Sequence, residues 1–280
     1  MAGPEPRTIP ACYGAWVATR LELDLAWLAA ATPLMTSAFW AEHGVSSATT
    51  RHAGPGDGAD CDPVRQVGRW FERVHLCAMR SADGVEVLAS NLALRNAGDT
   101  LGELDVVYRH AGQVVHREIA VKFYLAAKPG DDPSSWIGPG RRDRLDLKLG
   151  HLAKRQLTLP ERARDEGAWP EDLPFPDRSE VLLLGALFSP SDDPRLPSGA
   201  ETNAAQGRWY YAKEFAERFG DAPWAVLDKP WWLSPEHARQ APAQAATALA
   251  EELRSPRFVG RVGKAVERAF VVPDGWWSGI

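Results

Sequence analysis

Apolar and polar positions in the first 63 residues predict a helix followed by a flexible connection. The helix is expected within 13–40, because apolar residues recur there at helical spacing and Pro33 would end or kink it. Its apolar stripe consists of Leu21, Leu25 and Leu28. The stretch 43–63 is rich in Gly, Ser, Thr and Asp, a composition typical of loops.

A second helix is expected over about 63–80. Asp62 and Pro63 are typical of a helix start, since Asp caps exposed backbone N–H groups and Pro at the first position loses no needed donor. The buried stripe would comprise Val67, Phe71, Val74 and Ala78. An adjacent face carries Gly68, Glu72 and His75.

Three strands, a helix and a further strand are expected next. The alternating segments 85–94, 101–109 and 114–125, separated by short Gly, Asn and Asp turns, predict an antiparallel meander. A Pro- and Gly-rich loop leads to a helix at about 144–158, and the continuous apolar run 180–188 predicts a strand buried on both faces. The order helix, three strands, helix, strand predicts an α/β fold with a mixed central sheet.

Residues beyond 190 are harder to assign, apart from the helix-like segment AQAATALAEELRS. They hold six of the twelve tryptophans. Trp231 and Trp232 are interpreted as core residues, with stacking on unpaired bases as the alternative. The predicted division is an N-terminal helical extension and linker at 1–60, a core at 61–190, and a C-terminal extension at 191–280 packed on that core.

The hairpin expected within 101–125 carries more charges than a half-buried sheet needs. Side chains alternate across a strand, so Glu103 and Asp105 share one face of its first strand. Glu118 and Lys122 share one face of its second strand. Each strand is therefore expected to have one apolar face and one charged face.

A four-residue turn in this hairpin would pair Arg109 with Val114 and place Asp105 opposite Glu118, with Cβ atoms roughly 4.5–5.5 Å apart. Two carboxylates at that separation repel unless a proton or a cation lies between them. Mg²⁺ suits the position, because it takes one or two carboxylates and keeps several waters, one of which can become a nucleophile. The ammonium group of Lys122 would orient that water or stabilise charge on a phosphate.

Composition fits a globular protein and gives no support for a membrane span or a zinc site. The 280 residues are 45% hydrophobic and 25% charged. No uncharged apolar run of about 18 residues exists and the N-terminal stretch lacks a signal-peptide pattern, so we expect a cytoplasmic protein without membrane segments. The three cysteines favour reduced thiols, and neither a CxxC nor an HExxH motif occurs.

The stretches GELDVV and EIAVK resemble the signature of the PD-(D/E)XK, or restriction-endonuclease-like, nuclease superfamily. In that superfamily an Asp on one strand and a Glu-x-Lys on the next bind metal and activate water, and the core runs helix, three strands, helix, strand. The segments RLELDLAWLAAATPLM, GRWFERV, LGELDVV, AVKFYL and GRRDRLDLKL also resemble an uncharacterised bacterial domain-of-unknown-function family of about this length. The superfamily resemblance implies a nuclease that acts on DNA with Mg²⁺ or Mn²⁺, in repair, recombination or defence.

The resemblance also implies roles for individual residues. Asp105 matches the superfamily's Asp, Lys122 its Lys, and Glu72 the Glu that many relatives project from the first helix. Ala120 stands where the second acidic residue is usual. Either Glu118, two positions earlier on the same face, serves as a displaced ligand, or the site is degenerate and binds no metal productively. The catalytic candidates are Asp105, Glu118, Lys122 and Glu72, and the candidate metal ligands are Asp105, Glu118, Glu72 and Glu103.

One basic cluster stands out against the net charge of −5. Eight basic and three acidic residues lie within 141–164. Such runs are usually solvated faces, but this one follows the strand that carries Lys122, where nuclease-like relatives often contact the phosphate backbone. The candidate nucleic-acid contacts are Arg141, Arg142, Arg144, Lys148, Lys154, Arg155 and Gln156.

Three interpretations of these residues remain open. The first is the metal-dependent nuclease, and the second is an inactive nuclease fold that binds nucleic acid or a protein partner, which Ala120 motivates. The third is an unrelated α/β protein in which Asp105 and Lys122 form an ordinary ion pair on a solvated sheet face. Opposite orientation of those two side chains would favour the third interpretation. His75 and His116 are assigned to packing or surface roles.

Overall fold

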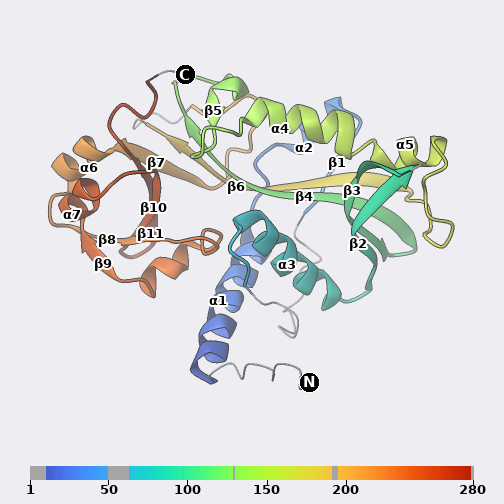
Figure 1. The fold of residues 1–280 in the computed structure, drawn as a ribbon, viewed down its shortest axis with the longest axis horizontal. Coiled ribbons are helices and arrows are strands. Elements are labelled where there is room, and N and C mark those ends of the chain that lie inside the picture. The colour runs from blue at the N-terminus through green and yellow to red at the C-terminus, as the bar shows by residue number, and fades with distance from the viewer. Residues whose placement is uncertain (1–10, 50–62, 97, 129, 191–194, 279–280) are drawn as a thin grey trace, which may run out of the picture.

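The computed structural model describes residues 11–49, 63–96, 98–128, 130–190 and 195–278, the side chains of 11–18 excepted. Eleven strands form one mixed sheet, and helices lie on both of its faces (Figure 1). The strands are β1 (Ser46–Ser47), β2 (Val85–Asn96), β3 (Asp99–His110), β4 (Gln113–Ala126), β5 (Trp136–Ile137), β6 (Arg178–Ser189), β7 (Gln206–Tyr211), β8 (Pro223–Val226), β9 (Ala243–Ala245), β10 (Arg257–Val262) and β11 (Val266–Val272).

The helices and helical turns are α1 (Ala11–Ala30), α2 (Ser37–Glu42), α3 (Val67–Arg80), η1 (Pro133–Ser135), α4 (Leu145–His151), the π-helical turn η2 (Leu152–Gln156), α5 (Leu159–Asp165), α6 (Ala212–Phe219), η3 (Pro235–Arg239) and α7 (Ala246–Glu251). From α3 to β6 the predicted helices and strands follow in the expected order, and β5 and α5, which the sequence does not predict, lie among them. The predicted strands lie in the order β2-β3-β4-β6, with β2, β3 and β4 antiparallel and β6 parallel to β4. The expectation of a mixed α/β fold is confirmed.

The β3–β4 hairpin has the predicted register but a tighter turn. Arg109 pairs with Val114 as expected, and His110 also pairs with Gln113, so the turn has two residues instead of four. Those two residues, Ala111 and Gly112, have φ angles of 48° and 79°. Positive φ at both positions gives the turn a twist that matches the strands it joins.

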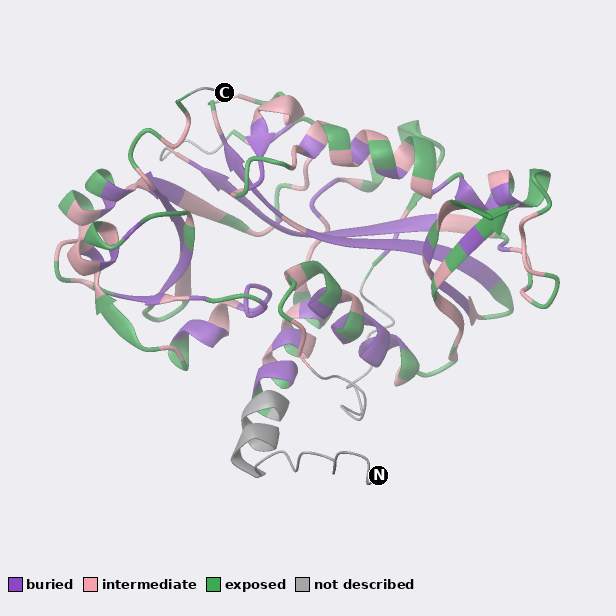
Figure 2. Ribbon diagram, in the orientation of Figure 1, coloured by how far each residue is buried: buried purple, intermediate pink, exposed green. Residues whose placement is uncertain are grey.

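Helices bury the central strands on both faces, which corrects the expectation of one charged, solvated face (Figure 2). On one face α1 and α3 cover a cluster that includes Ile119 and Leu184. On the other face α2 and α4 cover a cluster that includes Tyr124 and Leu183. Every β4 residue from Val114 to Val121 is buried. Charged side chains of β4 must therefore find partners inside the protein.

A buried ionic network joins β3, β4 and β6. The Arg117 Nε donates to Glu180 Oε1 at 2.5 Å, and its Nη2 donates to the Tyr108 hydroxyl at 2.9 Å. That hydroxyl donates in turn to Glu180 at 2.8 Å, and Arg178 pairs with the same carboxylate. Burial opposes ionisation of Glu180, but the two arginines hold its pKa below the usual value. The fully buried His75 lies near Arg117 and packs against Phe71, as a packing role requires.

A second buried polar cluster ties α1 to α3 and to the C-terminal half. The fully buried carboxylate of Asp24 accepts hydrogen bonds from the Trp70 indole at 2.7 Å and from the Ser234 backbone N–H at 3.0 Å. The His237 Nε2 lies 2.8 Å from the same carboxylate. Asp24 and Trp70 lie in the RLELDLAW and GRWFERV stretches, so part of the chain's sequence signature is structural.

Residues beyond 205 extend the same sheet, an arrangement that the hydrophobic pattern does not predict. β7 runs parallel to β6 and β11, and β10, β8 and β9 follow as antiparallel neighbours. α6 and α7 pack against them around Phe215 and Trp224. Trp231 and Trp232 are also buried, in agreement with their interpretation as core residues.

Several local expectations change. The stretch 43–63 contains β1, which pairs with β6, and its residues 50–62, including the predicted helix start at Asp62, lie outside the described residues. α3 begins only at Val67. Cys77 is disulfide-bonded, although the cysteine count favours reduced thiols. In the described part of the chain, every helix is too short or too polar to span a membrane.

Candidate functional site

Three of the four predicted catalytic residues, Glu72, Asp105 and Lys122, line a pocket of about 210 Å³ formed by α3, β3, β4, α4 and η2. Asp105 and Lys122 both line this pocket, which is the arrangement that a joint site requires. The lining residues are Gly68, Phe71, Glu72, Asp105, Ile119, Ala120, Val121, Lys122, Lys148 and Gln156. The pocket therefore combines acidic, basic and amide groups from five elements.

Asp105 lies where β3 separates from β4. Regular pairing of the two strands ends at Val106 and Arg117, and the Asp105 Oδ2 accepts the Ile119 backbone N–H at 2.9 Å instead. Burial, and next the charge of Glu118, raise the pKa of Asp105 to about 7. The hydrogen bond from the Ile119 N–H favours the ionised carboxylate, but burial outweighs it and the pKa rises.

Glu118 is fully buried beneath the pocket and does not line it. Its Oε1 lies 2.9 Å from the His116 Nε2, and its Oε2 accepts from the Gln156 amide. Burial raises the pKa of Glu118 to about 7 and lowers the pKa of His116 to about 4. The imidazole is therefore neutral near pH 7, and Asp105 and Glu118 together retain a proton there.

The π-helical turn η2 places Gln156 at the centre of a polar network. Its Oε1 accepts from the Lys148 ammonium at 3.0 Å and lies 2.9 Å from the His151 Nδ1, while its Nε2 reaches Glu118. Burial and the nearby charge of Lys122 lower the pKa of Lys148. π-helical turns are rare and often occur at functional sites.

Lys122 is held at the pocket by a loop between β5 and α4. Its Nζ lies 2.5 Å from the Asp143 Oδ2, and the Tyr124 hydroxyl donates to the other oxygen of Asp143 at 3.3 Å. Opposite Lys122 on β6 stands Gly185, with φ 137°. A Cβ there would lie 1.6 Å from the Lys122 carbonyl oxygen, so only glycine fits beside this lysine.

Of the two remaining acidic candidates, one lines the pocket and the other does not. Glu72 lines the pocket, and its pKa is raised by burial and then by the charges of Asp105 and Glu103. Glu103 is exposed and lies outside the pocket lining, although its charge contributes to the raised pKa of Glu72. Ala120 lines the pocket and offers no ligand atom. Within the described ranges, no three His, Cys, Asp or Glu side chains are grouped closely enough to form a metal site by themselves.

The predicted nucleic-acid contacts divide into two groups. Lys148 and Gln156 line the pocket, so they belong to the candidate centre itself. Arg144 pairs with Asp146, and the Arg141 guanidinium lies 5.6 Å from the centre of the Trp276 ring. The fully exposed members of the cluster are Arg141, Arg142, Lys154 and Arg155.

Two contributors to this centre were not predicted in their observed roles. Asp143 was counted only as a negative charge within the basic cluster, and its ion pair with Lys122 spans 21 residues of chain. His116 was assigned to packing or surface, and it contacts Glu118 two residues along the strand. The spacing His-x-Glu on a strand was the only available signal, since it puts both side chains on one face.

As pH rises from about 4.5 to 7, the wild type is expected to lose free energy of unfolding that the Glu118→Gln variant keeps. The folded-state pKa of this acid lies above its unfolded value, so the folded wild type binds the extra proton and loses stability as pH increases through this window. The free energy of unfolding of the variant, relative to that of the wild type, should rise by about 3 kcal/mol at most over this range. Urea unfolding at pH 4.5, 6 and 8 measures it.

The matched control for this measurement is Glu86→Gln, because Glu86 is an exposed acid paired with Arg109. Its effect on the free energy of unfolding should be about 0–1 kcal/mol and nearly constant over the same pH range. If the stability of Glu118→Gln relative to the wild type falls as pH rises, the folded wild type holds this carboxylate ionised.

Comparison with known proteins gives one match. A family model described as domain of unknown function (DUF1853) matches residues 23–277. No curated protein and no solved structure matches the chain. The match includes α3, the whole sheet and the pocket described above. The chain therefore belongs to the DUF1853 family of domains of unknown function.

Proposed function

We propose that this protein is a divalent-metal-dependent nuclease that hydrolyses DNA phosphodiester bonds, built on a restriction-endonuclease-like core at 61–190. The observation that carries the proposal is the meeting of Glu72, Asp105 and Lys122, from three different elements, in one pocket. Support also comes from the order and pairing of α3, β2, β3, β4, α4 and β6. A repair, recombination or defence role remains part of the proposal.

The carboxyl groups present fit Mg²⁺ or Mn²⁺ better than a softer metal. Asp105 and Glu118 lie close enough for each to perturb the other's pKa, and a hard cation between them would relieve their repulsion. Each Glu118 oxygen still has a lone pair beyond its hydrogen bond. The remaining ligands would be water and phosphate oxygens, since among the described residues no third acidic side chain is grouped with these two. When bound, the metal would polarise the phosphate and lower the pKa of a coordinated water.

The protein's own groups would position the reaction around the phosphate. Lys122, oriented by Asp143, would donate to a phosphate oxygen as negative charge develops on it. Glu72 lines the same pocket with a raised pKa, so it would accept the proton of the attacking water. Gln156 would fix Glu118 and Lys148 in place. The exposed arginines and lysine of the basic cluster would hold the flanking phosphates.

Incubation of the purified protein with Mg²⁺ or Mn²⁺ should cleave at least one of four DNA forms: linear, supercoiled, single-stranded or branched. Cleavage should fail in excess chelator. Lys122→Ala, purified identically, should be at least about 100-fold slower, because a donor to the developing charge is lost. Equal cleavage by both proteins would identify a contaminating nuclease.

A catalytically inactive nuclease fold that binds nucleic acid or a protein is the second candidate, and Ala120 favours it. This residue lines the pocket where a second acid would otherwise present its carboxylate. The inactive form would bind DNA with the same affinity in Mg²⁺ and in chelator, and no DNA form would be cut. Metal-dependent cleavage that Lys122→Ala removes would exclude it.

A further inference from the structure

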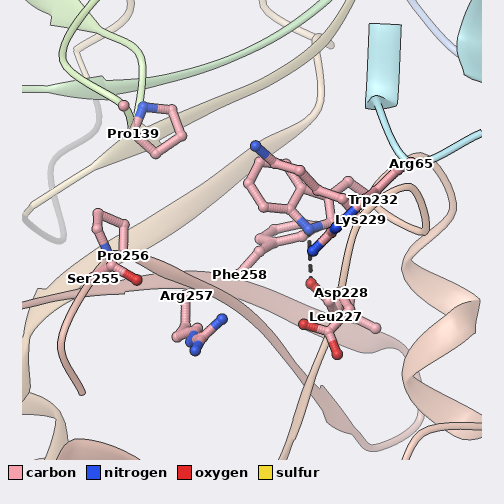
Figure 3. A pocket seen from close by; sticks show the side chains of 11 residues that line it. Arg65, Pro139, Leu227, Asp228, Lys229, Trp232, Ser255, Pro256, Arg257 and Phe258 are labelled. Atoms are coloured by element: carbon pink, nitrogen blue, oxygen red, sulfur yellow. Dashed lines mark hydrogen bonds between the residues drawn. The ribbon is translucent and has the colours of Figure 1, made fainter. Parts of the chain in front are cut away.

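A second cavity, of about 660 Å³, lies outside the candidate centre (Figure 3). Its walls come from the residue stretch before α3, the loop after β5, the segment after β8 and the start of β10. Pro139 and Pro256 stand on one side, and Asp228, Lys229 and Trp232 on the other. A volume in this range accommodates a small organic ligand.

The cavity is basic although the protein as a whole is acidic. Arg65, Lys229 and Arg257 line it against a single acid, Asp228, in a chain of net charge −5. All three cations are exposed, and among the described residues none of them forms an ion pair. Three unneutralised cations around one cavity attract an anion with more than one oxygen, such as a phosphate group.

A fixed aromatic wall accompanies these charges. The Trp232 indole N–H donates to the Leu227 carbonyl at 2.7 Å, and its ring contacts those of Phe123, Phe258 and Phe270. Trp232 is only 8% exposed and the Lys229 ammonium lies 4.7 Å from the centre of its ring, so the indole presents a small part of its surface to the cavity. A rigid apolar surface beside cations suits a ligand that has both a flat or apolar part and a phosphate.

One short loop connects this cavity to the candidate centre. Pro139 and Gly140 line the cavity, and Asp143, three residues on, holds Lys122. The Gly138 N–H donates to the Asp143 carbonyl at 2.8 Å and closes the loop. Three residues span at most about 10 Å, so a strand bound at one end of the loop lies near the other.

We propose that this cavity binds one nucleotide unit, its phosphate paired with Arg65, Lys229 and Arg257 and its base or sugar against the Trp232 wall. The unit would belong to a nucleic-acid strand that continues to the candidate centre, in which respect the inference rests on the proposed function. A free nucleoside monophosphate offers the same chemistry, and the two sources are separated by experiment.

The test measures binding in EDTA, where cleavage cannot contribute. The probes are a fluorescent single-stranded DNA 12-mer, followed by anisotropy, and thymidine monophosphate, followed by calorimetry. The cavity variant is Lys229→Ala/Arg257→Ala, and the control is Arg95→Ala/Lys264→Ala, which removes the same charge from exposed positions that do not line the cavity. Thermal unfolding checks that both are folded.

The cavity variant should bind the 12-mer about tenfold more weakly at 100 mM salt, and the slope of log affinity against log salt should fall in magnitude by about 0.7, since one single-strand phosphate contact is lost. The control should bind like the wild type. Unchanged DNA binding with loss of monophosphate binding would assign the cavity to free nucleotides. Unchanged binding of both probes would overturn the proposal.

Failure of the proposed function gives a different result. If the wild type cuts no DNA form in Mg²⁺ or Mn²⁺ but the cavity variant still loses affinity in EDTA, the nuclease proposal fails and the strand-binding cavity stands. If the wild type cuts DNA and the cavity variant binds both probes normally, the nuclease proposal stands and the strand-binding cavity fails.

Discussion

Asp105→Asn is expected to lower the rate of metal-dependent DNA cleavage at least about 100-fold while leaving the protein as stable as the wild type, or more stable. The amide oxygen can still accept the Ile119 N–H, and the amide group can donate to Glu118, so the structural contacts survive. The negative charge that would attract the metal is lost, and charge stabilisation at a reacting phosphate is worth a factor of this size.

Two measurements on the same preparation separate the roles of Asp105. Single-turnover cleavage in Mg²⁺ gives the rate, and urea unfolding at pH 8 gives the stability. Asp99→Asn is the matched control, because Asp99 is an exposed acid at the start of the same strand. Loss of stability without loss of cleavage would mean that Asp105 only supports the fold.

Glu180→Ala is expected to destabilise the protein by about 3–5 kcal/mol, because it leaves the guanidinium of Arg117 buried without its carboxylate. Arg117 is 2% exposed and Glu180 3% exposed, so water cannot replace the lost partner. For a chain of this size the midpoint of thermal unfolding should fall by about 10 °C. Scanning calorimetry at pH 7.5 measures the change.

The control for Glu180 is Glu86→Ala, which removes an exposed carboxylate from its pair with Arg109. Exposed pairs contribute about 0–1 kcal/mol, so the melting point of this variant should move by only a few degrees. A similar loss for both variants would indicate that the Arg117 site admits water. Neither residue lines the candidate pocket, so a folded Glu180 variant should keep its DNA affinity.

The position of Asp105 relative to Lys122 could be predicted because strand alternation is a local rule. Pairing of Arg109 with Val114 followed from the hairpin, and period-two spacing then put Asp105, Glu118 and Lys122 on one side. Burial could not be predicted the same way. Whether a charged strand face meets water or a helix depends on α4 and η2, whose packing is decided by residues far along the chain.

Gln156 shows a different limit of sequence reasoning. In a regular α-helix, residues eight positions apart differ by about 80° around the axis, so Lys148 and Gln156 would point in different directions. The π-helical turn adds a residue to one turn and brings the two side chains within 3.0 Å. The sequence predicts Lys148 and Gln156 as members of one basic cluster, and their contact with each other depends on this turn. The C-terminal strands were missed because they are short and pair with distant partners.

The continuous sheet limits how this chain can be divided. β6 lies between β4 and β7, and its Phe188 packs against Phe258 and Phe270 from the last two strands. A fragment ending near residue 190 would leave Leu187, Phe188 and Ser189 at the end of β6 without their β7 partners and would uncover the Phe188 ring. Unpaired strand edges recruit strands from other molecules. The fragment would consequently aggregate when expressed alone, and studies of the pocket's chemistry require the full length of the sheet.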